Sequence, residues 1–140
     1  MADITAHYKL STPSDSIGEA QRPTGFWVAA TESTSEVIGY LGLDSDYLPR
    51  GEPSIGQLRR MVVSARHRRR RIGSLLITAA LDHAKRHSDF EMLELETTLF
   101  QPAAQALYKK HGFEVFRSRV MRLGPFYSVK VLGFRRPVKD

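Results

Sequence analysis

Four consecutive arginines, Arg68–Arg71, stand directly before Ile72 and Gly73 in the stretch SARHRRRRIGSLL. Helix N-termini normally carry acidic residues, because their free N–H groups and the helix dipole make that end positive. Arginines there repel one another and the dipole unless a bound anion neutralises them. A basic turn between a strand and a helix that opens with glycine therefore predicts a phosphate-binding turn, in which Gly73 lets the backbone approach its ligand closely.

The arginine run alone has other interpretations. It is also typical of a solvated face, a nuclear localisation signal or a nucleic-acid patch. A nuclear signal normally lies in an exposed flexible segment rather than at the entrance to a helix. The chain carries 21 Lys and Arg against 15 Asp and Glu, and seven of its arginines lie between Arg59 and Arg71 with no acid among them. This concentration favours an anionic ligand or surface.

A phenol at Tyr108 is the second candidate for chemistry. It lies in QPAAQALYKKHGF, residues 101–113, where Pro102 near the first turn and Gly112 near the end predict a short helix. A tyrosine, with an ordinary pKa near 10, is protonated at neutral pH and can donate a proton to a leaving group. Its position alone favours a packing aromatic beside Leu107 and Phe113.

Periodicity outlines the scaffold that must position these residues as β-β-β-α-β-α-β-β. Apolar residues spaced as on one helix face predict a helix from Ile72 to near Ser88, and residues 101–112 form the second. Runs of β-branched and aromatic residues predict strands at 25–31, 37–43, 55–64, 90–98, 113–123 and 126–134. We expect residues 1–24 to be irregular and residues 25–140 to form one domain of the α+β class, with a mixed sheet.

Composition excludes several kinds of site. The chain has no cysteine, so disulfides, thiolate metal sites and cysteine nucleophiles are absent. No apolar run approaches the roughly 18 residues of a membrane span, and no secretory signal is visible, so the chain by itself predicts a soluble, cytoplasmic protein. His83 and His87 have the spacing of a metal pair on a helix, but no carboxylate pattern accompanies them, and we expect no metal.

Both candidate segments resemble motifs of the GNAT superfamily of N-acetyltransferases. RRRRIG, residues 68–73, is similar to the family's pyrophosphate motif Gln/Arg-x-x-Gly-x-Gly/Ala, with Arg71 where the first glycine is usual. Residues 101–113 are similar to Asn-x-x-Ala-x-x-x-Tyr-x-x-x-Gly-Phe, with Gln101 in place of Asn. The most similar subgroup is the camello-like, membrane-associated acetyltransferases, and the resemblance covers roughly residues 25–120.

The resemblance implies a mixed central sheet flanked by helices, acetyl-CoA as cosubstrate and no metal. It implies a primary amine as acceptor, on an amino acid, a cysteine conjugate or a protein lysine, which attacks the thioester directly. Tyr108 would be the catalytic proton donor. The residues that it assigns to acetyl-CoA are Met61, Val62, Val63, Arg68, Arg69, Arg70, Arg71, Ile72, Gly73, Ser74 and Gln101.

Two departures from the family pattern leave alternatives open. The family fold begins with a strand and two helices, which we expect to be missing from this N-terminally shortened chain. The position of the family's catalytic Glu falls on Gln57, which cannot accept a proton, and Glu94, Glu96, His67 and a water chain are all open as the base. A non-catalytic acyl-CoA-binding or regulatory module is therefore the second hypothesis, and a basic nucleic-acid-binding domain ranks last.

The location and the assembly of the protein are less constrained. The camello-like subgroup implies association with endomembranes, in contrast to the soluble chain that composition predicts. Aromatic residues mix with Lys and Arg in the C-terminal stretch PFYSVKVLGFRRPVKD, which suggests contact with a membrane surface, an acceptor-site lining or a final sheet strand. The sequence predicts no oligomeric state.

Overall fold

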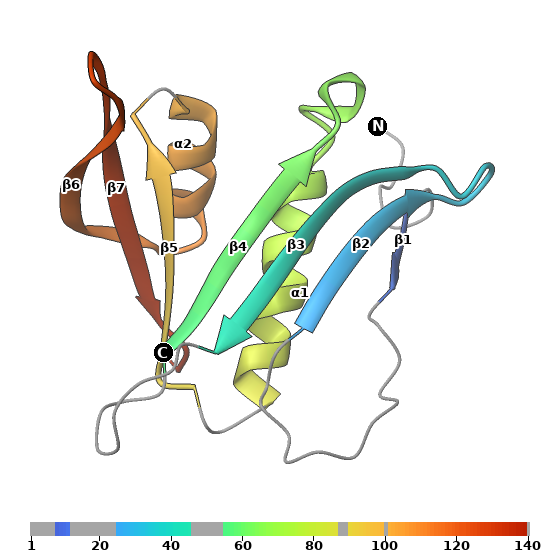
Figure 1. The fold of residues 1–140 in the computed structure, drawn as a ribbon. Coiled ribbons are helices and arrows are strands. Elements are labelled where there is room, and N and C mark those ends of the chain that lie inside the picture. Colours follow the sequence, from blue (N-terminus) through green and yellow to red (C-terminus); the bar gives the residue numbers. More distant parts are fainter. Residues whose placement is uncertain (1–7, 12–24, 46–54, 87–89, 100, 140) are drawn as a thin grey trace.

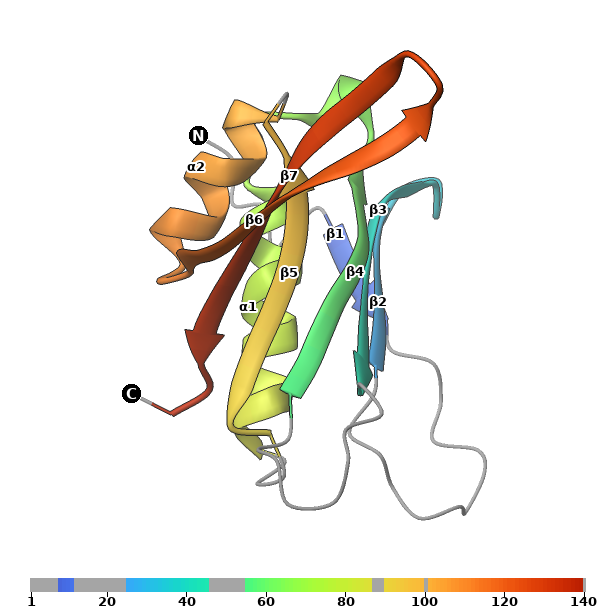
Figure 2. The ribbon, with the colours of Figure 1, turned by 60° about the vertical axis from the view of Figure 1, so that its left-hand side comes forward.

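The computed structural model describes residues 8–11, 25–45, 55–86, 90–99 and 101–139. Within these residues, one seven-stranded mixed sheet has the order β1-β2-β3-β4-β5-β7-β6 (Figure 1). The strands are β1 (Tyr8–Ser11), β2 (Gly25–Thr31), β3 (Val37–Ser45), β4 (Ile55–Val63), β5 (Met92–Thr98), β6 (Glu114–Gly124) and β7 (Tyr127–Pro137), and the helices are α1 (Ile72–Arg86) and α2 (Pro102–Lys110). Both helices cover the same face of the sheet (Figure 2).

Periodicity predicted six of these strands and both helices, and the structure confirms them with small changes at their ends. The apolar stripe of α1 explains why this helix packs where it does. Leu76, Ile77 and Ala80 are fully buried against the sheet, and α1 contacts β2, β3 and β4. The same core extends across β5 and β7 through Leu93 and Phe134, which are also fully buried. The α+β class is therefore confirmed.

Strands β4 and β5 are the only parallel neighbours among the described strands, and they pair over a short distance. Their register covers Ile55–Gln57 against Met92–Glu94 and stops there. Beyond this point β5 continues to pair with β7, whereas β4 continues to pair with β3. The two strands consequently diverge toward the end of the sheet where α1 begins (Figure 1).

A β-bulge in β4 lies just beyond the last β4–β5 pair. Gly42 pairs with Arg59 and Tyr40 with Val62, so Leu41 alone faces two residues of β4, Arg60 and Met61. Arg60 has a φ of 58°, the left-handed conformation that glycine usually takes at such a bulge. Because a bulge bends its strand and increases the local twist, this one accounts for the divergence of β4 from β5.

The expectation that residues 1–24 are irregular, with the first strand of the fold missing, is wrong at residues 8–11, which form a strand. β1 pairs antiparallel with β2, from Tyr8 opposite Thr31 to Ser11 opposite Val28, and forms an edge of the sheet. A four-residue strand is too short for its alternation to stand out, which is why periodicity missed it. The two family helices that we expected to be missing would fall in residues 12–24, which lie outside the described residues.

Gly112 follows the C-cap of α2, and a substitution there tests its left-handed backbone conformation. It has a φ of 85°, and an added Cβ would meet only ordinary contacts, the nearest 3.6 Å away on Arg136. We expect Gly112→Ala to lower the free energy of unfolding by about 1 kcal/mol, because alanine resists the left-handed conformation. Urea unfolding followed by circular dichroism measures the change. Gly124→Ala is the matched control, since an added Cβ there meets nothing within 4 Å, and an equal loss in both variants would contradict the prediction.

Candidate functional site

The arginine turn leads directly into the N-terminus of α1. Ser64 donates its N–H to the carbonyl of Ile38 over 2.7 Å, which fixes the beginning of the turn to β3. Arg69 and Arg71 are left-handed, with φ values of 65° and 61°. Left-handed residues in turns direct successive N–H groups into a concavity that binds anions. Arg71 also accepts the first helical hydrogen bond, from Leu75 over 3.0 Å.

The first N–H groups of α1 point out of the helix and have no carbonyl of the helix to bond. These groups belong to Ile72, Gly73 and Ser74, which follow the capping residue Arg71. The first turn contains no acidic residue, and the side chains of Arg68–Arg71 are exposed. Donors, helix dipole and guanidinium charges therefore coincide at one end of one helix, which is the environment that a phosphate group prefers.

The backbone of Arg71 is left-handed, which explains why the family motif usually has a glycine at this position. A non-glycine residue in the left-handed region costs about 1–2 kcal/mol. The departure from the family motif therefore changes the energy of the turn without preventing its shape. It adds a positive charge at the mouth of the turn in exchange.

Gly73 has a packing role that the sequence did not reveal. An added Cβ would lie 2.8 Å from Cδ2 of Leu107 in α2 and 3.1 Å from Cε of Met61 in β4. The glycine therefore lets three elements meet at the start of α1. A hydrogen bond fixes the same junction, since Nε2 of His111 lies 3.0 Å from Oγ of Ser74. Burial, then the charges of Lys110 and Arg136, lower the pKa of His111, which keeps the ring neutral at neutral pH.

The end of β4 carries three of the residues that the resemblance assigns to acetyl-CoA. Met61 is the second residue of the bulge, and Val62 and Val63 follow it and pair with Tyr40 and Gly39 of β3 on one side. On the other side β5 has already diverged, so β4 offers an edge there. An extended strand edge is a surface along which an amide-containing chain can hydrogen-bond.

Tyr108 is held by α2 with its ring in the core and its hydroxyl at the divergence of β4 and β5. Its ring centroid lies 5.8 Å from that of Phe134 and 6.2 Å from that of Phe113. Its hydroxyl donates to Sδ of Met61 over 4.0 Å, a weak bond to a soft acceptor. Burial raises the pKa of Tyr108, so the phenol stays protonated at physiological pH. Packing and proton-donor interpretations are thus compatible.

Gln101 forms the N-cap position of α2 without capping it through its side chain. Its Oε1 accepts a hydrogen bond from Oγ1 of Thr97 over 2.7 Å, and Gln105 donates to the carbonyl of Thr98 over 3.2 Å. These two bonds attach the first turn of α2 to the end of β5. Gln101 therefore fixes the helix that carries Tyr108.

A pocket of about 590 Å³ opens where β4 and β5 diverge. Its lining consists of residues 57–61 of β4, Leu41 of β3, Leu95 and Glu96 of β5, Arg117 and Arg119 of β6, Gln101 and Tyr108. Of the predicted site residues, the pocket brings together Met61, Gln101 and Tyr108. Val62, Val63 and residues 68–74 lie outside its lining, along the continuation of β4 and at the start of α1.

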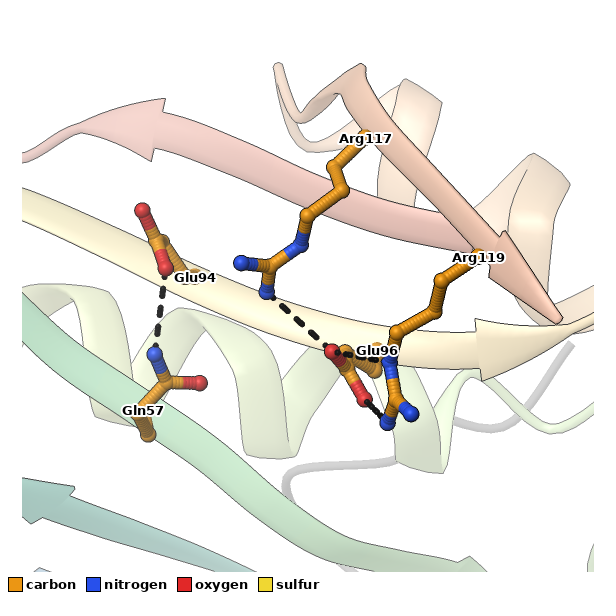
Figure 3. A network of polar contacts seen from close by, with 5 residues as sticks. All are labelled: Gln57, Glu94, Glu96, Arg117 and Arg119. Carbon is orange, nitrogen blue, oxygen red and sulfur yellow. Dashed lines mark hydrogen bonds and ion pairs between the residues drawn. The ribbon is translucent and has the colours of Figure 1, made fainter. Parts of the chain in front are cut away.

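Two sets of polar contacts cross the strands near this pocket (Figure 3). Nε2 of Gln57 donates to Oε2 of Glu94, its register partner, over 3.1 Å. Glu96 accepts bonds from two of the three arginines of β6, with Nη2 of Arg119 at 2.7 Å and Nη2 of Arg117 at 3.1 Å. Hydrogen bonding by Arg119 is the main reason that the pKa of Glu96 is lowered, although burial opposes it. Glu96 is therefore ionised at neutral pH and is a poor proton acceptor.

Sequence reasoning missed the arginines of the pocket. Arg59, Arg60, Arg117 and Arg119 line it together with one carboxylate, Glu96. Two signals were available, namely the i, i+2 spacing of Arg117 and Arg119 on one strand face and the same spacing of Glu94 and Glu96 on another. The proximity of β5 and β6 could not be inferred from the sequence, because β7 lies between them in the sheet but follows β6 in the chain.

The described part of the chain has neither a metal-binding cluster nor a helix that could cross a membrane. No group of three or more His, Asp or Glu side chains gathers there in a way that could hold a metal ion. The rings of His83 and Trp27 pack in a T-shaped arrangement at a centroid distance of 5.2 Å, and His87 lies outside the described residues. Among the helices described, none is long and apolar enough to cross a membrane.

Comparison with known proteins agrees with this geometry. Residues 3–113 match the family model described as the acetyltransferase (GNAT) family. The chain is 37% identical over 106 residues to rat N-acetyltransferase family 8 member 3, covering 70% of this chain and 43% of that protein. It is 32% identical over 136 residues to mouse N-acetyltransferase family 8 member 7, covering 93% of this chain and 54% of that protein. The chain thus spans about half the length of these relatives.

The fold itself also has solved counterparts. Arabidopsis thaliana NAA60 in complex with acetyl-CoA superposes with a TM-score of 0.71 and 16% identity, covering 86% of this chain and 79% of that chain. At this identity the likeness concerns the fold.

Two substitutions at position 71 separate backbone strain from charge. Arg71→Gly and Arg71→Ala both remove the guanidinium group, but only glycine accepts a φ of 61° without strain. We expect the free energy of unfolding of the glycine variant to exceed that of the alanine variant by about 1 kcal/mol. Urea unfolding in a phosphate-free buffer measures both. Equal stabilities would show that the turn carries no left-handed strain at this residue.

Proposed function

This chain belongs to the acetyltransferase (GNAT) family, and we propose that it transfers an acetyl group from acetyl-CoA to a primary amine. The observation that carries the proposal is a continuous path of contacts. The anion-binding turn at the start of α1 packs through Gly73 on Met61, and Met61 contacts the Tyr108 hydroxyl in the pocket. A phosphate site and a proton donor thus flank one open strand edge.

Acetyl-CoA fits the chemistry of this path. Its pyrophosphate matches the N–H groups of residues 72–74 and the charges of Arg68–Arg71. Its pantetheine arm carries amides that match the edge of β4 at Met61–Val63. That NAA60 is described in complex with acetyl-CoA on the same fold supports this assignment.

The proposed chemistry is direct acyl transfer. Acetyl-CoA supplies the activated acetyl group as a thioester. The neutral amine of the acceptor attacks the thioester carbonyl carbon, so that a C–N bond forms and the C–S bond breaks. Tyr108 donates its proton to the departing sulfur, the proton of the amine passes to solvent, and the tyrosinate takes a proton back from solvent. The four arginines that line the pocket favour the neutral over the ammonium form of an acceptor amine, because they repel its charge.

Binding of acetyl-CoA tests the role of the arginine turn. Arg69→Gly combined with Arg71→Gly removes two charges while the backbone keeps its left-handed shape. We expect this variant to bind acetyl-CoA with a Kd raised about tenfold, because charge-assisted contacts to the pyrophosphate are lost. Isothermal titration calorimetry measures the Kd.

The matched control carries the same loss of charge at the other end of the helix. Lys85→Ala combined with Arg86→Ala removes two exposed charges in the last turn of α1, and its Kd should stay within about twofold of the parent value. If the folded parent chain does not bind acetyl-CoA, or if both double variants lose affinity equally, the assignment of the turn is wrong.

Removal of the Tyr108 hydroxyl tests catalysis separately from binding. Tyr108→Phe keeps the ring contacts with Phe113 and Phe134, so the fold and the Kd for acetyl-CoA should not change. We expect kcat to fall at least about 100-fold, as is typical when a general acid is lost. An amine panel with thiol detection measures turnover. Binding without turnover of any amine by the parent chain would instead support the acyl-CoA-binding module.

The pH dependence of the same assay has a defined sign. Burial raises the pKa of Tyr108 above its ordinary value near 10. The acid is therefore fully protonated throughout the neutral and mildly alkaline range. We expect kcat to show no loss that reflects a tyrosine ionisation below that ordinary value.

A further inference from the structure

The β6–β7 hairpin extends beyond the rest of the sheet. The pairing of β5 with β7 ends at Thr98 opposite Val131. Leu99 still donates its N–H to the carbonyl of Lys130 over 3.2 Å. From the Met121–Val129 pair to the turn, β6 and β7 pair only with each other in the described structure. The hairpin consequently projects as a two-stranded arm (Figure 2). We call residues 120–130 the hairpin arm.

The hairpin arm exposes large apolar side chains to solvent. Phe126 at the turn is 98% exposed, and its neighbours Tyr127 and Leu123 are 65% and 57% exposed. Val120 is 67% exposed at the base of the arm. Scattered single apolar residues on a surface are ordinary, but a group of four on one short projection is typical of an interaction site.

The charge of the hairpin arm and its base has one sign. Residues 115–139 contain seven Lys and Arg and no Asp or Glu. Arg117 and Arg119 bond Glu96 at the base. Arg122 and Lys130 lie farther out, where their register partners are Ser128 and Val120 rather than acids. The arm therefore combines an apolar tip with cations just behind it.

We propose that the hairpin arm docks on an anionic lipid surface. Phe126 and Leu123 enter the boundary between headgroups and acyl chains, where apolar side chains gain most from leaving water. Tyr127 is suited to the interface because its ring is apolar and its hydroxyl is polar. Arg122 and Lys130 contact the lipid phosphates, since basic residues near an anionic membrane are attracted to it.

The arm fits a lipid surface better than a second copy of the chain. β6 is an edge strand, and antiparallel pairing of two such edges would bring Arg117, Arg119 and Arg122 of both copies together. Charged side chains on an edge strand are a usual protection against that pairing. A nucleic acid fits less well, because its phosphates would bind the cations and leave Leu123 and Phe126 in water.

The single tryptophan of the chain gives a clean spectroscopic test. Trp27 is 4% exposed in the core, whereas Phe126→Trp places a reporter at the tip. With vesicles of phosphatidylcholine and phosphatidylserine, we expect emission at position 126 to shift to shorter wavelength and to be quenched by brominated lipid. Vesicles of phosphatidylcholine alone should give a much smaller response. No shift and no quenching with either vesicle would overturn the proposal.

Vesicle flotation of the full chain measures the contribution of each kind of residue. We expect Phe126→Ser with Leu123→Ser to weaken binding at least about tenfold, from the loss of apolar burial. Arg122→Gln with Lys130→Gln should weaken it about tenfold or more and remove most of the dependence on phosphatidylserine. Val37→Ser is the matched control, because Val37 is 56% exposed on the opposite β2–β3 hairpin, and it should bind like the parent chain.

The remaining outcomes decide against a lipid surface. Flotation that is unaffected by the tip variants, or that Val37→Ser reduces as much, would overturn the assignment of the arm. A change in oligomeric state on Phe126→Ser without vesicle binding would identify the occupant as a second copy. Binding of the parent chain to DNA but not to vesicles would identify a nucleic-acid surface. Far-ultraviolet circular dichroism of the same variants confirms their folding and keeps this test independent of the proposed acetyltransferase function.

Discussion

The divergence of β4 from β5 is the constraint on which the rest of the structure depends. After Gln57 and Glu94 the two parallel strands stop pairing, and the bulge at Arg60 and Met61 bends β4 away. One change of direction thereby creates the open edge of β4 and the pocket between the strands. It also leaves space for α2 to place Tyr108 against Met61. Without the bulge, β4 and β5 would continue to pair. Their hydrogen bonds would then close the edge of β4, the pocket and the space that Tyr108 occupies.

Backbone strain is concentrated around this opening. Four non-glycine residues in the described structure have positive φ, and three of them are the arginines Arg60, Arg69 and Arg71. Each occupies a conformation that glycine adopts without strain, and each places a cation beside the pocket or the α1 N-terminus. Residues that break local preferences in this way persist when the surroundings over-determine them, and they cluster at functional sites. These three positions therefore combine positive charge with local backbone strain.

Much of the fold could be predicted because its elements carry strong local signals. The stripe of Leu76, Ile77 and Ala80 has a helical period, and the six longer strands are rich in β-branched residues. β1 has only four residues and no such signal. The pocket could not be predicted, since its lining depends on a bulge and on a strand order in which β7 precedes β6. Motif resemblance predicts roles for Tyr108 and the turn, but it contained nothing about Arg117 and Arg119, which belong to neither motif.

Gln57 shows how the residue type at one position of the site depends on the residue at a neighbouring position. Its register partner across the parallel pair is Glu94, whose Oε2 accepts its amide N–H over 3.1 Å. A glutamate at position 57 would place two carboxylates side by side, and their repulsion would raise the pKa of one of them or separate the strands. A glutamine replaces that repulsion with a hydrogen bond at the last pair before β4 and β5 diverge. The amide at position 57 and the carboxylate at position 94 are therefore one feature, and they fix the point from which the pocket opens.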